Sequence, residues 1–188
     1  MAGLIPGHIS TQGQLNEWEQ QNIVEGERWA FARKHKDLLS LEFMRLLHRK
    51  LFAGTWRWAG TFRTSGKNIG VPPEYISTRL RDLCEDVRAQ LEHHSYPVRE
   101  IAARFHHRLV QIHPFPNGNG RFSRCMTDLL LVGNNEQPFE WGVGDLNVSG
   151  EVRDRYIAAL GEADRSDYGP LLDFLGVGAA GPDGSRSA

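Results

Sequence analysis

Hydrophobic residues recur at intervals of three and four along most of the chain, the spacing that places side chains on one face of an α-helix. The pattern predicts helices at about residues 11–36, 40–52, 77–91, 101–112, 122–130, 152–163 and 171–175. Residues 176–188, which follow the last of these helices, are mostly small, with almost no bulky side chains. We therefore expect a mainly α domain over residues 1–175, followed by a disordered tail over residues 176–188.

One stretch, residues 56–71, departs from the helical pattern. Aromatic and polar residues alternate up to Arg63, a turn-like segment follows, and apolar residues resume at Ile69 before two prolines. This order predicts a short β-hairpin, the only one in the chain. A hairpin that merely packs on the helices is the alternative to one that binds a partner.

The first expected helix carries a carboxylate at an inward position. It begins near Thr11, which has capping-box spacing to Gln14. One face is formed by Leu15, Trp18, Asn22, Glu25, Trp29 and Ala32. A carboxylate on a buried face needs a partner, because an unpaired buried charge is very costly. Either Glu25 is paired inside the protein, or the helix is rotated and Glu25 reaches solvent.

The sequence His-Pro-Phe-Pro-Asn-Gly-Asn-Gly-Arg-Phe-Ser-Arg joins two of the expected helices. Proline disfavours the α conformation in the residue before it, so the first of these helices should end at or just before His113. Gly118 and Gly120 allow a sharp turn and a close approach of the backbone to a ligand. The next helix begins there, and its unpaired N–H groups form an anion site. Arg121 and Arg124 lie one turn apart and can both bind phosphate oxygens, so a histidine stands beside a phosphate site.

This motif resembles the signature of the Fic (filamentation-induced-by-cAMP) family, H-x-F-x-[D/E]-G-N-G-R-x-x-R. The match fails at one fixed position, where Asn117 replaces an acidic residue. Fic proteins typically transfer AMP from ATP to a hydroxyl side chain of a target protein. The resemblance extends from Leu15 to about Leu175. It implies a Fic-type helical bundle with one short β-hairpin flap, and a protein adenylyltransferase that modifies Ser, Thr or Tyr.

The resemblance also implies roles for the residues of the motif. His113 would be the general base that accepts the proton of the target hydroxyl, and Phe115 would be the buried aromatic residue that seats the loop. Arg121 would bind the β-phosphate and Arg124 the γ-phosphate. Three residues would surround the α- and β-phosphates: Gly118, Asn119 and Gly120.

Because Asn117 replaces an acidic residue, the sequence does not decide how Mg²⁺ is bound or which nucleotide is used. The family's acidic residue is a natural Mg²⁺ ligand, whereas an amide oxygen binds the ion with less charge. The site would then use Mg²⁺ through water, work slowly or favour a nucleotide other than ATP. The alternative interpretation is a nucleotide-binding regulatory or toxin-like module with weak or altered transferase activity. A kinase-like relative is a third class, although that branch replaces the glycine that here is Gly118.

Two more elements take roles from the resemblance. Many Fic proteins carry an inhibitory helix with the pattern [S/T]-x-x-x-E-[G/N], of which residues 21–26 keep the glutamate and the glycine but not the hydroxyl residue. Glu25 would pair with Arg124 and block the γ-phosphate, so we expect autoinhibition. The hairpin would be a flap that binds the target backbone by strand addition. The flap comprises Phe62, Arg63, Thr64, Ser65, Gly66, Lys67, Asn68, Ile69 and Gly70.

The composition of the chain limits the classes of partner that we expect. The chain has 188 residues, of which 40% are hydrophobic and 24% charged, and its net charge of -1 gives no reason to expect nucleic acid. Cys84 and Cys125 lie in apolar helical patterns, so we expect both to be core residues.

His106 lies seven positions before His113, but no carboxylate-bearing ligand pattern accompanies the two histidines, so we expect no structural metal. The sequence shows neither a signal peptide nor a membrane-spanning run, and we expect a cytoplasmic protein.

The N-terminal stretches 4–9 and 16–20 also resemble the Fic subgroup known as mobile mystery protein B. Members of this subgroup tend to be encoded beside a small helix-turn-helix protein. The resemblance therefore implies such a regulator as a possible partner, in addition to ATP and a protein substrate.

Overall fold

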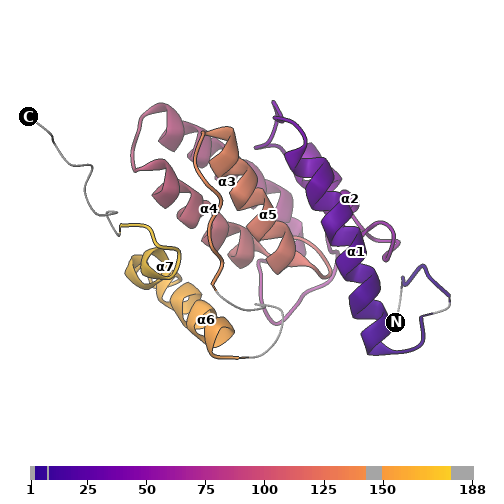
Figure 1. Cartoon of the computed structure of the whole chain (residues 1–188). Coiled ribbons are helices and arrows are strands. Elements are labelled where there is room, and N and C mark those ends of the chain that lie inside the picture. Colours follow the sequence, from indigo (N-terminus) through magenta and orange to yellow (C-terminus); the bar gives the residue numbers. More distant parts are fainter. Residues whose placement is uncertain (1–2, 8, 143–149, 179–188) are drawn as a thin grey trace, which may run out of the picture. The chain divides into compact units, whose positions relative to one another are not determined.

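A computed structural model describes residues 3–7, 9–142 and 150–178. Its elements are α1 (Gln12–Phe31), α2 (Leu41–Phe52), the 3-10 turn η1 (Pro73–Tyr75), α3 (Ile76–Glu92), α4 (Val98–Ile112), α5 (Asn119–Gly133), α6 (Glu151–Ala163) and α7 (Gly169–Phe174) (Figure 1). The expectation of a mainly α fold is confirmed. None of these helices combines the length and the apolar character that crossing a membrane requires.

The chain divides into two compact units, residues 1–137 and residues 138–188. The first unit contains helices α1 to α5, and the second contains α6 and α7, which pack on each other. The expectation of a single domain over residues 1–175 stays a prediction. The expected disordered tail lies, from residue 179 onward, outside the described residues.

The first unit places the Fic-like motif on a hydrophobic core. Helix α1 packs against α2, while α4 packs against both α3 and α5. Several of the largest buried side chains lie at or near the motif: Phe52, Phe105, Leu109, Ile112, Phe115 and Phe122. Cys84 and Cys125 are buried and free, as the sequence predicts. The loop between α4 and α5 is therefore built directly on the core.

Helix α1 begins as predicted and ends earlier. Thr11 caps it with a complete capping box. The helix ends at Phe31 rather than near Lys36. The physical reason is a contact made by His35, whose Nε2 lies 2.8 Å from the carbonyl oxygen of Ala30. This contact turns the chain back over the end of the helix.

The prediction that Glu25 lies on the inward face of α1 is wrong, because Glu25 is exposed. Trp18 and Trp29, on the same predicted stripe, are only half-buried. The buried stripe consists instead of Leu15, Glu19, Ile23, Gly26 and Ala30. Gly26 explains the rotation, because a Cβ atom there would lie 2.8 Å from the carbonyl oxygen of Lys50. The absence of that atom allows α1 to approach α2 closely.

The predicted hairpin is also wrong, since the described part of the chain contains no β-hairpin at residues 56–71. The two limbs of this segment bond to the end of α4 instead of to each other. The backbone N–H of Arg63 donates to the oxygen of Pro114 over 3.0 Å, and that of Val71 donates to Ile112 over 3.3 Å. These bonds use the backbone groups that a cross-strand ladder would need.

Candidate active site

His113 occupies a fixed position at the end of α4. The helix ends at Ile112, as predicted from the proline that follows His113. His113 itself has φ 52° and ψ 61°, a left-handed conformation that costs a non-glycine residue roughly 1–2 kcal/mol. Its backbone N–H donates to Leu109 over 3.1 Å, and its carbonyl oxygen accepts a bond from Nε of Arg63 over 2.7 Å. The surrounding structure therefore holds the backbone of His113 from both sides.

The surroundings of the His113 imidazole favour its neutral form. Burial lowers its pKa from 6.5, and the positive charges of Arg63 and Lys67 lower the pKa further, while the carbonyl of Val110 acts in the opposite direction. Its Nδ1 is buried, and no described residue forms a hydrogen bond with it. A neutral imidazole can accept a proton, and Nε2 is the nitrogen through which a proton from outside can reach this ring.

The side chains of Phe115 and Asn119 close the loop that follows His113. Phe115 is fully buried and stacks on His48, with ring centroids 3.7 Å apart. Oδ1 of Asn119 accepts the backbone N–H of Phe115 over 2.9 Å, and its Nδ2 donates to the Phe115 oxygen over 2.8 Å. Both polar atoms of the Asn119 side chain are thus used within the loop. The backbone N–H of Asn119, and not its side chain, can contribute to an anion site.

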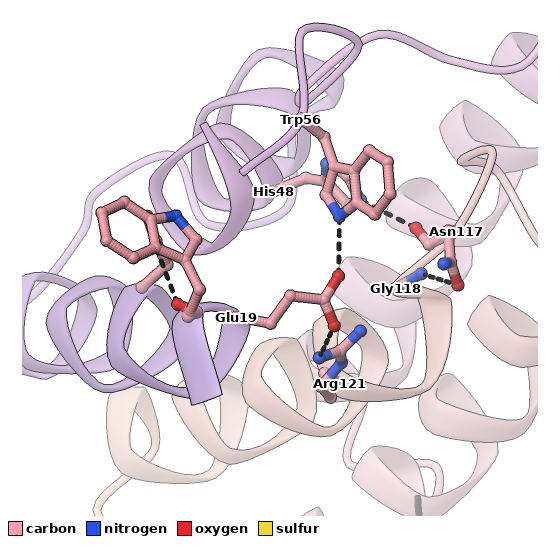
Figure 2. Close-up of polar contacts among 8 residues, drawn as sticks. Glu19, His48, Trp56, Asn117, Gly118 and Arg121 are labelled. Carbon is pink, nitrogen blue, oxygen red and sulfur yellow. Dashed lines mark hydrogen bonds and ion pairs between the residues drawn. The ribbon is translucent and has the colours of Figure 1, made fainter. Parts of the chain in front are cut away.

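His48 is a site residue that the sequence analysis missed. Its Nδ1 accepts the backbone N–H of Gly60 over 2.9 Å, which leaves the proton on Nε2 to be donated to the oxygen of Asn117 over 3.1 Å (Figure 2). Burial lowers the pKa of His48 to about 3, and the charge of Arg121 acts in the same direction. A histidine on the otherwise apolar face of α2 was the available signal.

The N-terminus of α5 has an open first turn, where the motif predicts an anion site. Gly118 is the N-cap residue, in a left-handed conformation with φ 76°. Because glycine has no side chain, it cannot cap the first turn, and no side chain makes the cap hydrogen bond. The N–H groups of the first turn and the positive end of the helix dipole can therefore act together on a phosphate.

Arg121, on the first turn of α5, is bound to a carboxylate of α1. Its Nη1 lies 3.0 Å from Oε2 of Glu19, while Oε1 of Glu19 accepts the indole N–H of Trp56 over 2.6 Å (Figure 2). Glu19 is only 8% exposed, so both of its oxygens are satisfied in a buried setting. The guanidinium of Arg121 also lies over the ring of Phe52, 4.9 Å from its centroid.

A sequence profile described as "Fic/DOC family" matches residues 38–131, which carry α2 to α5 and the loop around His113. The chain belongs to the Fic/DOC family. It is 29% identical over 147 residues to a protein adenylyltransferase of Caenorhabditis elegans, a match that covers 76% of this chain and 27% of that protein. The chain therefore spans about a quarter of the length of this curated relative.

Solved structures show the same fold. The N-terminal Fic domain of a VirB-translocated effector protein of Bartonella quintana superposes with a TM-score of 0.73 at 20% identity, covering 94% of this chain and 88% of that chain. A structure of a Bartonella quintana Fic domain of the same description contains bound ADP. It has a TM-score of 0.69 and 20% identity, and the match covers 90% of this chain and 86% of that chain.

The second arginine of the Fic motif, Arg124, does not pair with Glu25. In the described structure Glu25 is exposed and makes no ion pair. Glu27 is a carboxylate whose pKa responds to Arg124: partial desolvation raises this pKa, and the positive charge of Arg124 lowers it. The rotation of α1 thus turns Glu19 and Glu27 toward α5, where the sequence predicted Glu25.

The described residues around the loop offer few ligands for a magnesium ion. Within the described ranges, no group of three His, Cys, Asp or Glu residues could hold a metal. Asn117 offers one neutral oxygen, and this atom already accepts the N–H of Gly118 over 2.8 Å. His106 is buried, and its Nδ1 lies 3.3 Å from the hydroxyl of Thr127. Any Mg²⁺ at this loop would depend on nucleotide phosphates for most of its ligands.

The flap residues differ in exposure. Arg63 is buried, and Phe62 is half-buried with its ring 5.3 Å from that of Phe115. The remaining flap residues are exposed: Thr64, Ser65, Gly66, Lys67, Asn68, Ile69 and Gly70. One end of the flap is therefore anchored in the core, while the rest is accessible.

Proposed function

We propose that this protein transfers AMP from ATP to a Ser, Thr or Tyr hydroxyl of a target protein. The observation that carries the proposal is the fixed position of His113 beside the uncapped N-terminus of α5, in surroundings that lower the pKa of its imidazole. The names of curated relatives as protein adenylyltransferases and the ADP bound to a Bartonella quintana Fic domain support it. A cytoplasmic site of action and a helix-turn-helix regulator are not needed for this proposal.

In the proposed reaction, the target hydroxyl oxygen attacks the α-phosphorus of ATP. Its proton passes to Nε2 of His113, the new oxygen–phosphorus bond forms, and the bond to the bridging oxygen breaks so that pyrophosphate leaves. General-base assistance of this kind contributes roughly 10²–10⁴-fold to the rate. The N–H groups at the start of α5 would stabilise the negative charge on the phosphates. Mg²⁺ bound to the ATP phosphates would neutralise part of their charge.

The exposed flap residues 64–70 would bind the target segment. These residues are exposed, and the flap begins and ends on bonds to the chain around His113. An extended peptide can add to such a segment through main-chain hydrogen bonds, which gives affinity with little dependence on sequence. The target hydroxyl would thereby be held near His113.

We also propose that the protein is autoinhibited, and the contact between Glu19 and Arg121 supports this proposal. Arg121 would bind the β-phosphate, yet its Nη1 is 3.0 Å from the Glu19 carboxylate. A hydrogen bond to a charged group contributes about 1.5–3 kcal/mol, enough to compete with a phosphate for the same guanidinium. Helix α1 would therefore restrain the site through Glu19, while Glu25 is not proposed for this role.

Labelled ATP tests the reaction. The full chain is incubated with a cell lysate and with ATP labelled at either the α- or the γ-phosphate, and protein-bound label is measured. Label from the α-phosphate alone supports AMP transfer, whereas label from the γ-phosphate indicates a kinase-like reaction. Nucleotide binding without transfer of either label supports the regulatory-module interpretation. His113→Ala is the matched control, because it removes the base and leaves the phosphate-binding backbone in place.

A further inference from the structure

Arg63 is a buried arginine whose hydrogen bonds all go to backbone carbonyl groups. It is only 4% exposed. Its Nε donates to His113 over 2.7 Å and its Nη1 to Ser65 over 3.0 Å, while its Nη2 donates to Val71 and, over 3.4 Å, to Ile112. One guanidinium therefore joins both limbs of the flap to the last residues of α4.

The charge of Arg63 is stabilised without a carboxylate. Among the described residues it makes no ion pair, although a buried charge normally needs compensation. Two of its acceptors, Ile112 and His113, are carbonyl groups at the C-terminus of α4, where the helix dipole is negative and the carbonyls lack intrahelical donors. Arg63 thus satisfies the end of the helix that carries the histidine.

Gly70 shows how closely the flap lies against this arrangement. With φ 99°, it has a left-handed conformation, and a Cβ atom there would lie 2.6 Å from Nη2 of Arg63 and 2.8 Å from Cβ of His113. No other residue type fits this place without moving one of these neighbours. The flap backbone, the guanidinium and the histidine are therefore in direct contact.

We propose that Arg63 is a positioning residue that holds His113 and the flap together as one unit. The proton acceptor and the segment that presents the target hydroxyl then keep a fixed relative geometry. Such alignment is worth a large rate factor, since a displacement of about 1 Å can cost about 10²-fold. The catalytic role of Arg63 rests on the proposed function, whereas its contacts with His113 and the flap are independent of that function.

Arg63 also acts on His113 through its charge. The groups whose charges lower the pKa of His113 are Arg63 and Lys67, with the carbonyl of Val110 opposing them. Removing the charge at residue 63 should raise the pKa of His113, whereas a lysine there should largely keep it low. Charge and carbonyl anchoring can thus be separated by two substitutions.

The test compares Arg63→Met, Arg63→Lys and the control Arg57→Met, which replaces an exposed arginine outside the flap. We measure the transfer rate, the KM for ATP, amide hydrogen exchange of the flap and the pKa of the His113 imidazole by NMR. We expect Arg63→Met to lower kcat by about 100-fold with KM for ATP changed by less than about threefold. Its flap amides should exchange faster and the pKa of His113 should rise. Arg63→Lys should keep this pKa but lose most of the flap protection.

Unchanged flap exchange and unchanged kcat in a folded Arg63→Lys protein would overturn the inference, even if Arg63→Met fails to fold. A wild-type protein without transfer activity would contradict the proposed function instead. In that case, flap exchange and the pKa of His113 still decide whether Arg63 holds the two together.

Discussion

Arg121 and Glu19 are 102 positions apart in the sequence, yet their side chains lie 3.0 Å apart in a largely buried ion pair. The pair joins the first turn of α5 to the middle of α1, and Trp56 holds the second oxygen of the carboxylate. Breaking a buried pair from one side is costly because it leaves the other charge uncompensated. A phosphate at Arg121 would compensate that charge, so ligand binding and release of α1 are expected to be coupled.

The first prediction is that Glu19→Gln increases nucleotide binding and transfer. The amide oxygen can still accept the Trp56 indole N–H, but Arg121 loses its anionic partner and becomes available to a phosphate. The charged bond is worth about 1.5–3 kcal/mol, which corresponds to about tenfold or more in affinity for ATP. Binding is measured by isothermal titration calorimetry and transfer with α-labelled ATP, at verified folding.

Glu25→Gln is the matched control for this experiment, because Glu25 lies on the same helix and is exposed. It should leave binding and transfer within about twofold of wild type. Activation by Glu25→Gln but not by Glu19→Gln would show that α1 acts through the family's usual glutamate and that the pair at Arg121 is only structural.

The second prediction concerns His113 and pH. His113→Ala should abolish transfer while nucleotide binding persists, since the phosphates are bound by the backbone of α5 and by arginines. Because burial and two cations lower the pKa of His113 from 6.5, the neutral base persists as the pH falls. The acid limb of the wild-type pH–rate profile should therefore have its midpoint below pH 6.5. A midpoint well above that value would exclude His113 as the titrating base.

A third prediction addresses the one departure from the Fic signature. Asn117→Asp should strengthen the dependence on Mg²⁺ and raise transfer, because an anionic oxygen binds this ion better than an amide oxygen. A magnesium titration of the transfer rate for both proteins is the measurement. Identical titration curves would place residue 117 outside the metal's ligands, and a loss of activity would indicate that the amide suits a different nucleotide.

The fourth prediction is a loss of stability in mild acid. Burial lowers the pKa values of His48 and His106 to about 3, whereas both residues titrate near 6.5 in the unfolded chain. The unfolded state therefore binds more protons between these values, so stability is present above pH 6.5 and falls as the pH decreases toward 3. From pH 7.5 to 5.5 each histidine should cost roughly 1 kcal/mol of unfolding free energy.

Urea unfolding at the two pH values measures this effect. His106→Gln should be less stable at pH 7.5 but should lose less stability on acidification than wild type. His93→Gln, at an exposed position, should retain the wild-type pH dependence. An unchanged pH dependence in His106→Gln would show that His106 titrates normally in the folded protein.

Much of the helical architecture could be predicted from apolar spacing. The C-terminal end of α4 and the start of α5 follow from a proline after His113 and from Gly118, and the capping box at Thr11 was visible in the sequence. These features depend on local backbone preferences, which a short stretch of sequence specifies. The same local signals place the uncapped first turn of α5 directly after the loop, and an anion site at that turn stays a prediction.

The buried face of α1 could not be predicted in this way. Leu15 begins two neighbouring stripes, and hydrophobicity favours the one with Trp18 and Trp29. The structure uses the other stripe, whose members include Glu19 and Gly26. Glu19 is buried because Arg121 and Trp56, both distant in sequence, satisfy it, and Gly26 is buried because α2 approaches closely. Both reasons depend on residues that are distant in the sequence, so the sequence of α1 alone does not reveal them.

The flap was mispredicted for a similar reason. Alternation of aromatic and polar residues favours paired strands, but the carbonyls of Ser65 and Val71 bond to the guanidinium of Arg63. A charged side chain thus replaces the neighbouring strand as donor. An arginine in an alternating stretch gives no sign, by itself, that it will be buried among carbonyl groups.

The bonds between Asn119 and both backbone groups of Phe115 have a consequence for the kinetics of nucleotide capture. They require no ligand, so they already fix the shape of the loop in the free protein. Ordering a flexible loop would otherwise cost about 1–2 kcal/mol for each residue fixed. A preorganised loop loses little entropy when nucleotide arrives, so association should be limited by diffusion and by the departure of Glu19 rather than by a search among loop conformers.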